Sequence, residues 1–191
     1  HISLDDYMIK PVSVESSVIV KPLAGFIMIG KANIYPKIIE LKGPREIIRN
    51  VNELETIEKT FNSVESSIKA RIDLKFDFPR VVETSDTSVI FEAKIESIGE
   101  RIISEVPVNI LNIPEGIISF ANPSTVSLTV SGGVDFIASL EPNDIYVSID
   151  FNELNEGNLS HEPLVVVPDD VLQWSDLSPK TVELTIRRLP E

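Results

Sequence analysis

The sequence predicts a mostly β protein built from two tandem, small, β-rich domains in an elongated arrangement, each with one short helix. Three observations predict this architecture. The apolar residues, 42% of the chain, are rich in Ile and Val, and β-branched side chains suit a pleated, half-buried surface. Apolar residues recur at every second position, as they do in strands. This pattern occurs twice within 191 residues, a length that can hold two small domains.

The second half shows the alternation most clearly. Strands are expected at residues 106–110, 126–130, 145–149, 164–167 and 182–186. Between them, turns are expected around Pro114 and Gly116, and at residues 131–133, 155–157 and 168–170, where Gly, Pro, Asn and Asp gather.

The repeat is visible by eye. Residues 68–74 and 145–151 both alternate apolar side chains and then carry an Asp, Asp73 or Asp150. We align these two segments. Further pairs join residues 39–43 to 128–132, 47–51 to 136–140, 78–82 to 167–171, and 89–93 to 182–186. The unit of about 90 residues is too long for a solenoid repeat and is long enough for a small domain.

This alignment sets the expected domains. The first copy covers residues 13–98 and the second covers 99–191. Residues 1–12 are expected to be the tail of a preceding domain or residues foreign to the natural chain. The first copy departs from the second by an insertion at residues 55–67 and by a longer connection at residues 25–36.

One short helix is expected in each copy. In the first copy Pro44 can occupy the first helical position, where its missing N–H costs nothing. Ile47, Val51 and Leu54 then recur at helical spacing and form one apolar stripe. The second helix is expected to be shorter and to end at Pro142.

Charge and composition exclude several classes of function. The net charge is −13, and no basic stripe could neutralise phosphates, so we expect no nucleic-acid partner. Residues 1–100 carry a net −3 and residues 101–191 a net −10. The acidic half could meet cations or a basic partner, but a surface that serves solubility is the favoured interpretation. Because the chain has no Cys, disulfides, Cys-bound zinc and a thiol nucleophile are excluded.

A search for catalytic, cofactor-binding and metal-binding residues finds none, so we expect no enzyme and no cofactor. His1 and His161 are the only histidines, and His161 is expected in a solvated loop. Asp73 and Asp150 are expected to accept backbone N–H bonds in the turn after a strand. Phe120, Phe136 and Trp174 are expected to be core residues or partly buried anchors. Asn158 begins a glycosylation acceptor pattern that is frequent by chance, and the acidic pairs Asp5–Asp6 and Asp169–Asp170 are expected in exposed turns.

No segment reaches the length of about 18–20 apolar residues that spans a bilayer. His1 is an unusual first residue, so we expect that an anchor upstream has been removed and that the membrane is reached only through it.

The order of these features resembles the YbbR-like domain of bacteria. Each copy has a Pro, an alternating strand, a Gly-led junction, a short apolar helix and an alternating strand that carries an Asp. The first copy shows them at residues 36–44, 47–51 and 68–74, and the second at residues 123–133, 136–140 and 145–151. The resemblance covers residues 13–189.

The resemblance implies a protein that lies on the extracytoplasmic face of the bacterial cytoplasmic membrane, behind an N-terminal transmembrane helix. It also implies a partner, a membrane-bound diadenylate cyclase that makes cyclic di-AMP, and a regulatory rather than catalytic role. The family offers no catalytic residues to transfer. The alternative is an envelope-binding module for a wall polymer or divalent cations, which the net charge of −10 in residues 101–191 suggests.

Overall fold

The computed structural model describes residues 6–154 and 160–188. The chain divides into two compact units, residues 1–96 and 97–191, and each is described here by itself. Both consist mainly of strands with one short α-helix, so the predicted mostly β fold is confirmed.

Unit 1 contains β1 (Tyr7–Glu15), β2 (Val18–Pro22), β3 (Phe26–Tyr35), β4 (Ile38–Pro44), α1 (Arg45–Ile48), β5 (Glu53–Glu55), β6 (Lys59–Val64), β7 (Ile68–Asp73) and β8 (Glu83–Thr84). β9 (Ser88–Leu111) begins in unit 1 and continues into unit 2. The rest of unit 2 is β10 (Ile117–Asn122), β11 (Thr125–Gly133), α2 (Val134–Ser139), β12 (Tyr146–Asp150), β13 (Ser160–His161), β14 (Leu164–Val166), β15 (Val171–Ser178) and β16 (Val182–Arg188), with the 3₁₀ turns η1 (Pro142–Asp144) and η2 (Phe151–Glu153).

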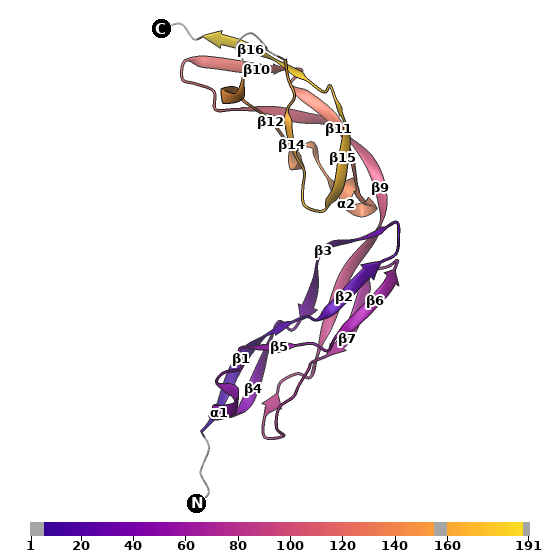
Figure 1. Ribbon diagram of the computed structural model, residues 1–191, viewed down its shortest axis with the longest axis vertical. Helices are drawn as coiled ribbons and strands as arrows, with labels where there is room; N and C mark the ends of the chain where they lie inside the picture. Colours follow the sequence, from indigo (N-terminus) through magenta and orange to yellow (C-terminus); the bar gives the residue numbers. More distant parts are fainter. Residues whose placement is uncertain (1–5, 155–159, 189–191) are drawn as a thin grey trace, which may run out of the picture. The chain divides into compact units, whose positions relative to one another are not determined.

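Unit 1 is built from two main sets of paired strands (Figure 1). In the first set β1 pairs antiparallel with β4 and parallel with β5, and β4 pairs antiparallel with β8. In the second set the first part of β9 pairs with both β7 and β3. The short parallel pair β2–β6 forms a third piece, which we call the arm.

Unit 2 repeats this pairing order. β9 pairs antiparallel with β11 and parallel with β12, and β11 pairs antiparallel with β15. The last strand, β16, lies between β10 and β13. Strand for strand, β1, β4, β5 and β8 correspond to β9, β11, β12 and β15. The group β3, β9 and β7 corresponds to β10, β16 and β13. The two units are therefore copies of one topology.

Several predicted equivalences hold in detail. The N–H of Val82 donates to the Pro79 carbonyl, and the N–H of Val171 donates to the Pro168 carbonyl, in matching turns. Ile48 and Ile137 are both buried beneath the short helices. The junction from strand to helix has nearly the same backbone angles at Pro44 and at Gly133. Residues 131–133, predicted as a turn, are instead the end of β11 followed directly by α2.

The alignment of residues 68–74 with residues 145–151 is wrong. β12 pairs parallel with β9, and the strand that pairs parallel with β1 is β5, not β7. β7 pairs antiparallel with the last strand of unit 1, as β13 does with the last strand of unit 2. Any strand that alternates and ends in Asp gives the same sequence pattern, whereas its partners are set by contacts distant in sequence.

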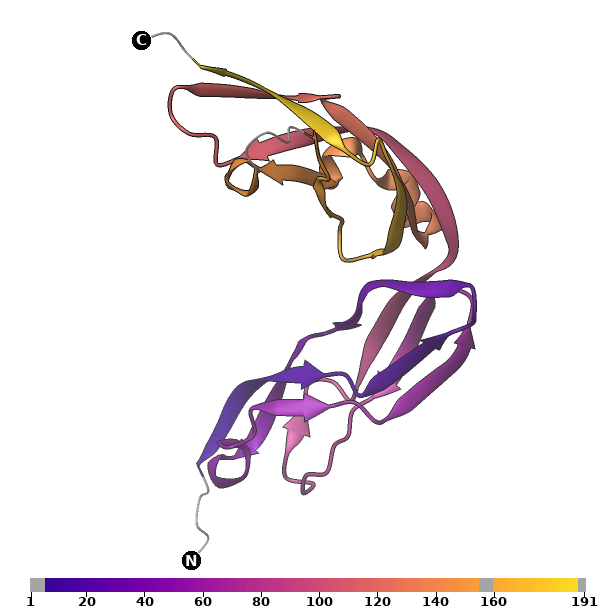
Figure 2. The same cartoon turned by 45° about the horizontal axis from the view of Figure 1, so that its top comes forward.

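The predicted insertion and the predicted longer connection of the first copy contribute to two different sheets. Residues 59–64 form β6, which pairs with β2, and the longer connection is occupied by β3 (Figure 2). Phe61 of the arm stacks on Phe91 of β9, with ring centroids 6.2 Å apart. The arm thus adds apolar cover to the core of unit 1.

The two helices differ from prediction. α1 has four residues and α2 has six, so the second is the longer one. Pro142 begins η1 rather than ending α2. Leu54, expected on the helical stripe, lies in β5 opposite Val14 and is buried. Here a strand contact distant in sequence overrides the local helical pattern.

Residues 7–12 belong to unit 1, because β1 pairs with β4 from Tyr7 onward. They are therefore not the tail of a preceding domain. Val12 and Val14 are part of the buried cluster of unit 1.

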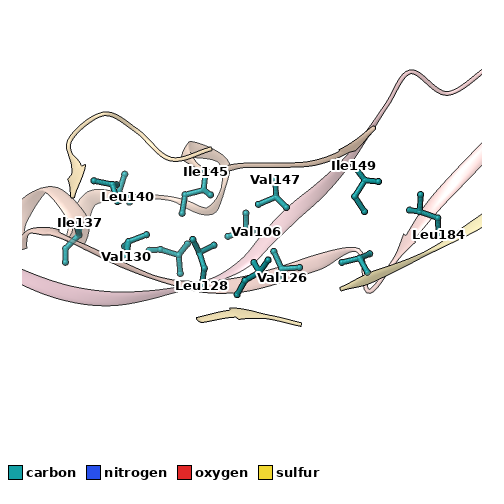
Figure 3. Close-up of a cluster of buried hydrophobic side chains, with 14 residues drawn as sticks. Val106, Val126, Leu128, Val130, Ile137, Leu140, Ile145, Val147, Ile149 and Leu184 are labelled. Atoms are coloured by element: carbon teal, nitrogen blue, oxygen red, sulfur yellow. The ribbon is translucent and has the colours of Figure 1, made fainter. Parts of the chain in front are cut away.

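The core of unit 2 lies between its strands and α2 (Figure 3). Val126, Leu128 and Val130 point inward from β11, and Ile145 and Val147 face them across the core. The inward positions alternate along β11, as the sequence predicts. The outward positions, which include Ser127, Thr129 and Ser131, are polar.

Candidate interaction surfaces

The described residues offer no arrangement typical of catalysis or of metal binding. Within residues 6–154 and 160–188, no group of three or more His, Asp or Glu side chains could hold a metal ion. His161 is not in a loop as predicted, because it pairs with Val182 as part of β13. It lines a small pocket together with Ser148, Asp150 and Glu153. His1, Asp5 and the Asn158 acceptor pattern lie outside the described residues.

Asp150 has the structural role that was predicted for it. Its Oδ1 accepts a bond of 2.9 Å from the N–H of Asn152, which begins η2, and its Oδ2 accepts one of 2.8 Å from Asn112 Nδ2. The bond from Asn112, and after it the backbone bond from Asn152, hold the pKa of Asp150 below its ordinary value of 3.8. The carboxylate therefore ties the ends of β9 and β12 together, and nothing in its geometry resembles a catalytic acid.

A cationic side chain on the first strand of each unit caps the short helix. In unit 2, Nη1 of Arg101 donates to the carbonyls of Ile137, Ala138 and Leu140 at 2.7 to 2.9 Å. In unit 1, Lys10 Nζ donates to the Arg49 carbonyl at 2.8 Å. The last carbonyls of a helix lack partners within the helix and favour a cation. Sequence analysis missed this pair, although Lys10 and Arg101 occupy matching positions opposite Leu41 and Val130.

The outer face of β3, β9 and β7 forms the first candidate surface, which we call the Tyr35 face. Tyr35 is 76% exposed, the most exposed of the large apolar and aromatic side chains described. Two shallow grooves meet at Tyr35 and Ile90. One is lined further by Pro36, Arg71, Ser85, Asp86, Thr87 and Ser88, and the other by Asn33, Ile34, Lys69 and Glu92. Lys69 and Glu92 form an ion pair of 2.6 Å across the strands.

The corresponding face of unit 2 carries two exposed apolar side chains on β10. On β10, Ile118 and Phe120 lie opposite Arg187 and Thr185 of β16. Phe120 is 55% exposed, so the prediction that it is a core residue or a partly buried anchor is wrong. Phe136 does pack against the core, as predicted. The exposure of Phe120 could have been predicted from the sequence. Ile118 and Phe120 are two residues apart and so lie on one face of the short strand, whereas the small residues Ser119 and Ala121 lie on the other.

A second apolar patch lies on the edge of unit 2. Tyr146 of β12 is directly opposite Val166 of β14, and Leu164 follows on the same face. All three side chains are exposed. Trp174 of β15, expected to be a core residue or a partly buried anchor, is 37% exposed and is not part of the core.

Comparison with known proteins finds a family match in the second half. Residues 106–186 match the family described as YbbR-like protein. These residues lie within unit 2 and run from β9 to β16. Most of unit 2 therefore matches the YbbR-like family.

Two further comparisons accompany this match. The crystal structure of a YbbR-like protein from Streptococcus pneumoniae TIGR4 aligns with 96% of this chain and 97% of its own, at 10% identity and a TM-score of 0.38. No curated protein matches the chain. The YbbR-like match ends within unit 2, and unit 1 is linked to it by the shared pairing order of the strands. No helix among the described residues is long and apolar enough to cross a membrane.

Proposed function

We propose that the chain is a non-catalytic interaction module on the extracytoplasmic face of the bacterial cytoplasmic membrane, within a membrane-anchored regulator of diadenylate cyclase. The observation that carries this proposal is the match of unit 2 to the YbbR-like family, with the same topology repeated in unit 1. The proposal expects a membrane anchor in the full-length protein. The cyclase is the protein partner, and the signal that is transmitted would be a change in cyclic di-AMP synthesis.

The surfaces described above suit a module that works through contacts. Exposed aromatic residues and Arg are enriched among the side chains that dominate binding energy at protein interfaces. Phe120 with Ile118, beside Arg187, provides such a set on unit 2. This face is the first that should be tested for contact with the cyclase.

The test compares cyclic di-AMP in cells that hold the cyclase with and without the anchored, full-length protein. A change in either direction is expected, together with co-purification of the two proteins from the membrane. Phe120→Ser should weaken both effects, whereas Tyr146→Ser, on the edge patch of the same unit, serves as the matched control. Unchanged cyclic di-AMP, with both proteins present in the membrane, would contradict the proposal.

The alternative is an envelope-binding module. For divalent cations the structure offers no support, because the described residues contain no cluster of three potential ligands. For a polymer, the Tyr35 face gives a specific observation, because the exposed Tyr35 lies where two grooves meet.

A further inference from the structure

We propose that the Tyr35 face of unit 1 binds a polysaccharide strand. This inference does not depend on the cyclase partner, because it rests only on the side chains of unit 1. Its starting point is Tyr35, a residue that is 76% exposed on the sheet face where the two grooves meet. An aromatic ring offers a flat apolar surface together with a polar hydroxyl, which fits the flat apolar face of a sugar ring.

The grooves on both sides of Tyr35 hold hydrogen-bond donors and acceptors together. Arg71 and Lys69 can only donate, Asp86 and Glu92 can only accept when ionised, and the amide of Asn33 can do both. Sugar hydroxyls also donate and accept. A mixed lining therefore matches a ligand rich in hydroxyl groups better than it matches a ligand of a single charge.

Charge favours a sugar over an acidic peptide. Asp86 and Glu92 would oppose an acidic chain in the same grooves where Arg71 and Lys69 would attract it. Lys69 is moreover engaged with Glu92 at 2.6 Å. A polymer of hydroxyl-bearing rings meets no such conflict.

Part of the lining is held in place before any ligand arrives. Ser85 Oγ donates to Asp86 Oδ2 at 2.9 Å and accepts from the N–H of Glu40 at 3.2 Å. Thr84 Oγ1 donates to the Asp86 carbonyl at 2.7 Å. Arg71 has no ion-pair or hydrogen-bond partner among the described residues, so its guanidinium is available. A site whose groups are fixed beforehand loses less freedom on binding.

The grooves also have the shape that a linear polymer requires. They share Tyr35 and Ile90, and they extend from this pair in two directions, toward Asn33 and Glu92 and toward Arg71 and Asp86. A strand stacked on Tyr35 would place one sugar over the ring and its neighbours in the grooves. The exposed faces of β-sheets serve as oligosaccharide sites in other β folds.

The test uses the whole chain with three probes: cellohexaose, chitohexaose and washed bacterial cell-wall sacculi. NMR titration follows the soluble hexamers, and co-sedimentation follows the sacculi. At least one probe is expected to bind, and the chemical-shift changes are expected to be confined to residues of the Tyr35 face. Tyr35→Ala should weaken binding by about tenfold, the loss of one stacking contact. Tyr35→Trp should retain it, and Tyr7→Ala, which removes another exposed tyrosine of unit 1, should leave it unchanged.

Circular dichroism of each variant confirms that the fold is retained. Binding that persists in 0.5 M NaCl supports a sugar ligand, since stacking and neutral hydrogen bonds are little screened. Binding that is lost in salt and insensitive to Tyr35→Ala would instead indicate an anionic partner held by the cations, and would overturn the proposal. Absence of binding to all three probes would overturn it as well. Neither result would affect the cyclic di-AMP measurement.

Discussion

Arg101 illustrates how a single side chain can complete a short helix. Three carbonyls at the end of α2 accept from one guanidinium nitrogen. Arg101→Ala should lower the free energy of unfolding by about 1.5–3 kcal/mol, the usual contribution of a hydrogen bond to a charged group. Urea unfolding measures the effect. Arg101→Lys, which keeps one cationic donor as Lys10 does in unit 1, should recover part of the loss, and equal stability of Arg101→Ala and the natural chain would contradict this role.

Asp150 predicts a specific dependence on pH. Its pKa is lowered in the folded protein because Asn112 and the N–H of Asn152 stabilise the ionised form. The stabilisation is therefore fully present above the ordinary pKa of 3.8 and is lost as the pH falls through the lower folded value. Asp150→Ala should destabilise the chain at pH 6, and the difference from the natural chain should shrink toward pH 2.5. Denaturant unfolding at a series of pH values measures this.

The double variant Asp150→Ala with Asn112→Ala tests whether the bond between these two side chains is responsible. If it is, the losses in free energy of unfolding of the two single variants at pH 6 should not add in the double variant. Additive losses, or a difference that stays constant down to pH 2.5, would show that Asp150 acts through something other than its charge.

At the scale of elements, the end of each strand that leads into a helix passes close to the turn that precedes its neighbouring strand. A Cβ on Gly132 would lie 3.0 Å from Ile137 Cγ2 and 3.2 Å from the Asp170 carbonyl oxygen, and one on Gly43 would lie 3.1 Å from Val82 Cγ2. Gly132→Ala should therefore cost about 1–3 kcal/mol through overpacking. Thermal or urea unfolding measures it. Thr129→Ala, on the exposed face of the same strand, is the control, and a Gly132→Ala variant as stable as that control would refute the close approach.

Sequence reasoning recovered what depends on local alternation. All five strands predicted for the second half begin within one residue of an observed strand or lie inside one, and the turns after Pro79 and Pro168 match. It failed where contacts with residues distant in sequence decide the secondary structure or the strand pairing. Leu54 takes part in a strand because Val14 lies beside it, and β7 could be told from β5 only by its pairing.

The candidate surfaces were harder to predict. No motif marks Tyr35, since one aromatic residue at the end of an alternating strand has the same pattern whether it faces the core or the solvent. Its neighbours Arg71, Asp86 and Asn33 come from separate segments that only the pairing of β3, β9 and β7 brings together.

At the scale of the whole molecule, the two units differ in net charge. Residues 97–191 hold 4 basic and 15 acidic residues, against 13 and 15 in residues 1–96. Self-repulsion should destabilise the folded state of the acidic unit, and salt should screen it. Added NaCl should raise the melting temperature of the isolated fragment 97–191 more than that of fragment 1–96. Differential scanning calorimetry of both fragments measures this, and equal shifts would contradict it.

The pairing of β9 also affects how unit 1 folds during synthesis. Both β3 and β7 of unit 1 pair with β9, which begins only at Ser88. Domains generally fold as units while the chain grows from its N-terminus. The first unit therefore has no finished second sheet until the ribosome has passed nearly all of its residues. During that interval the nascent chain would expose the apolar sides of β3 and β7, which makes this part of unit 1 the most prone to aggregate before Ser88 has been synthesised.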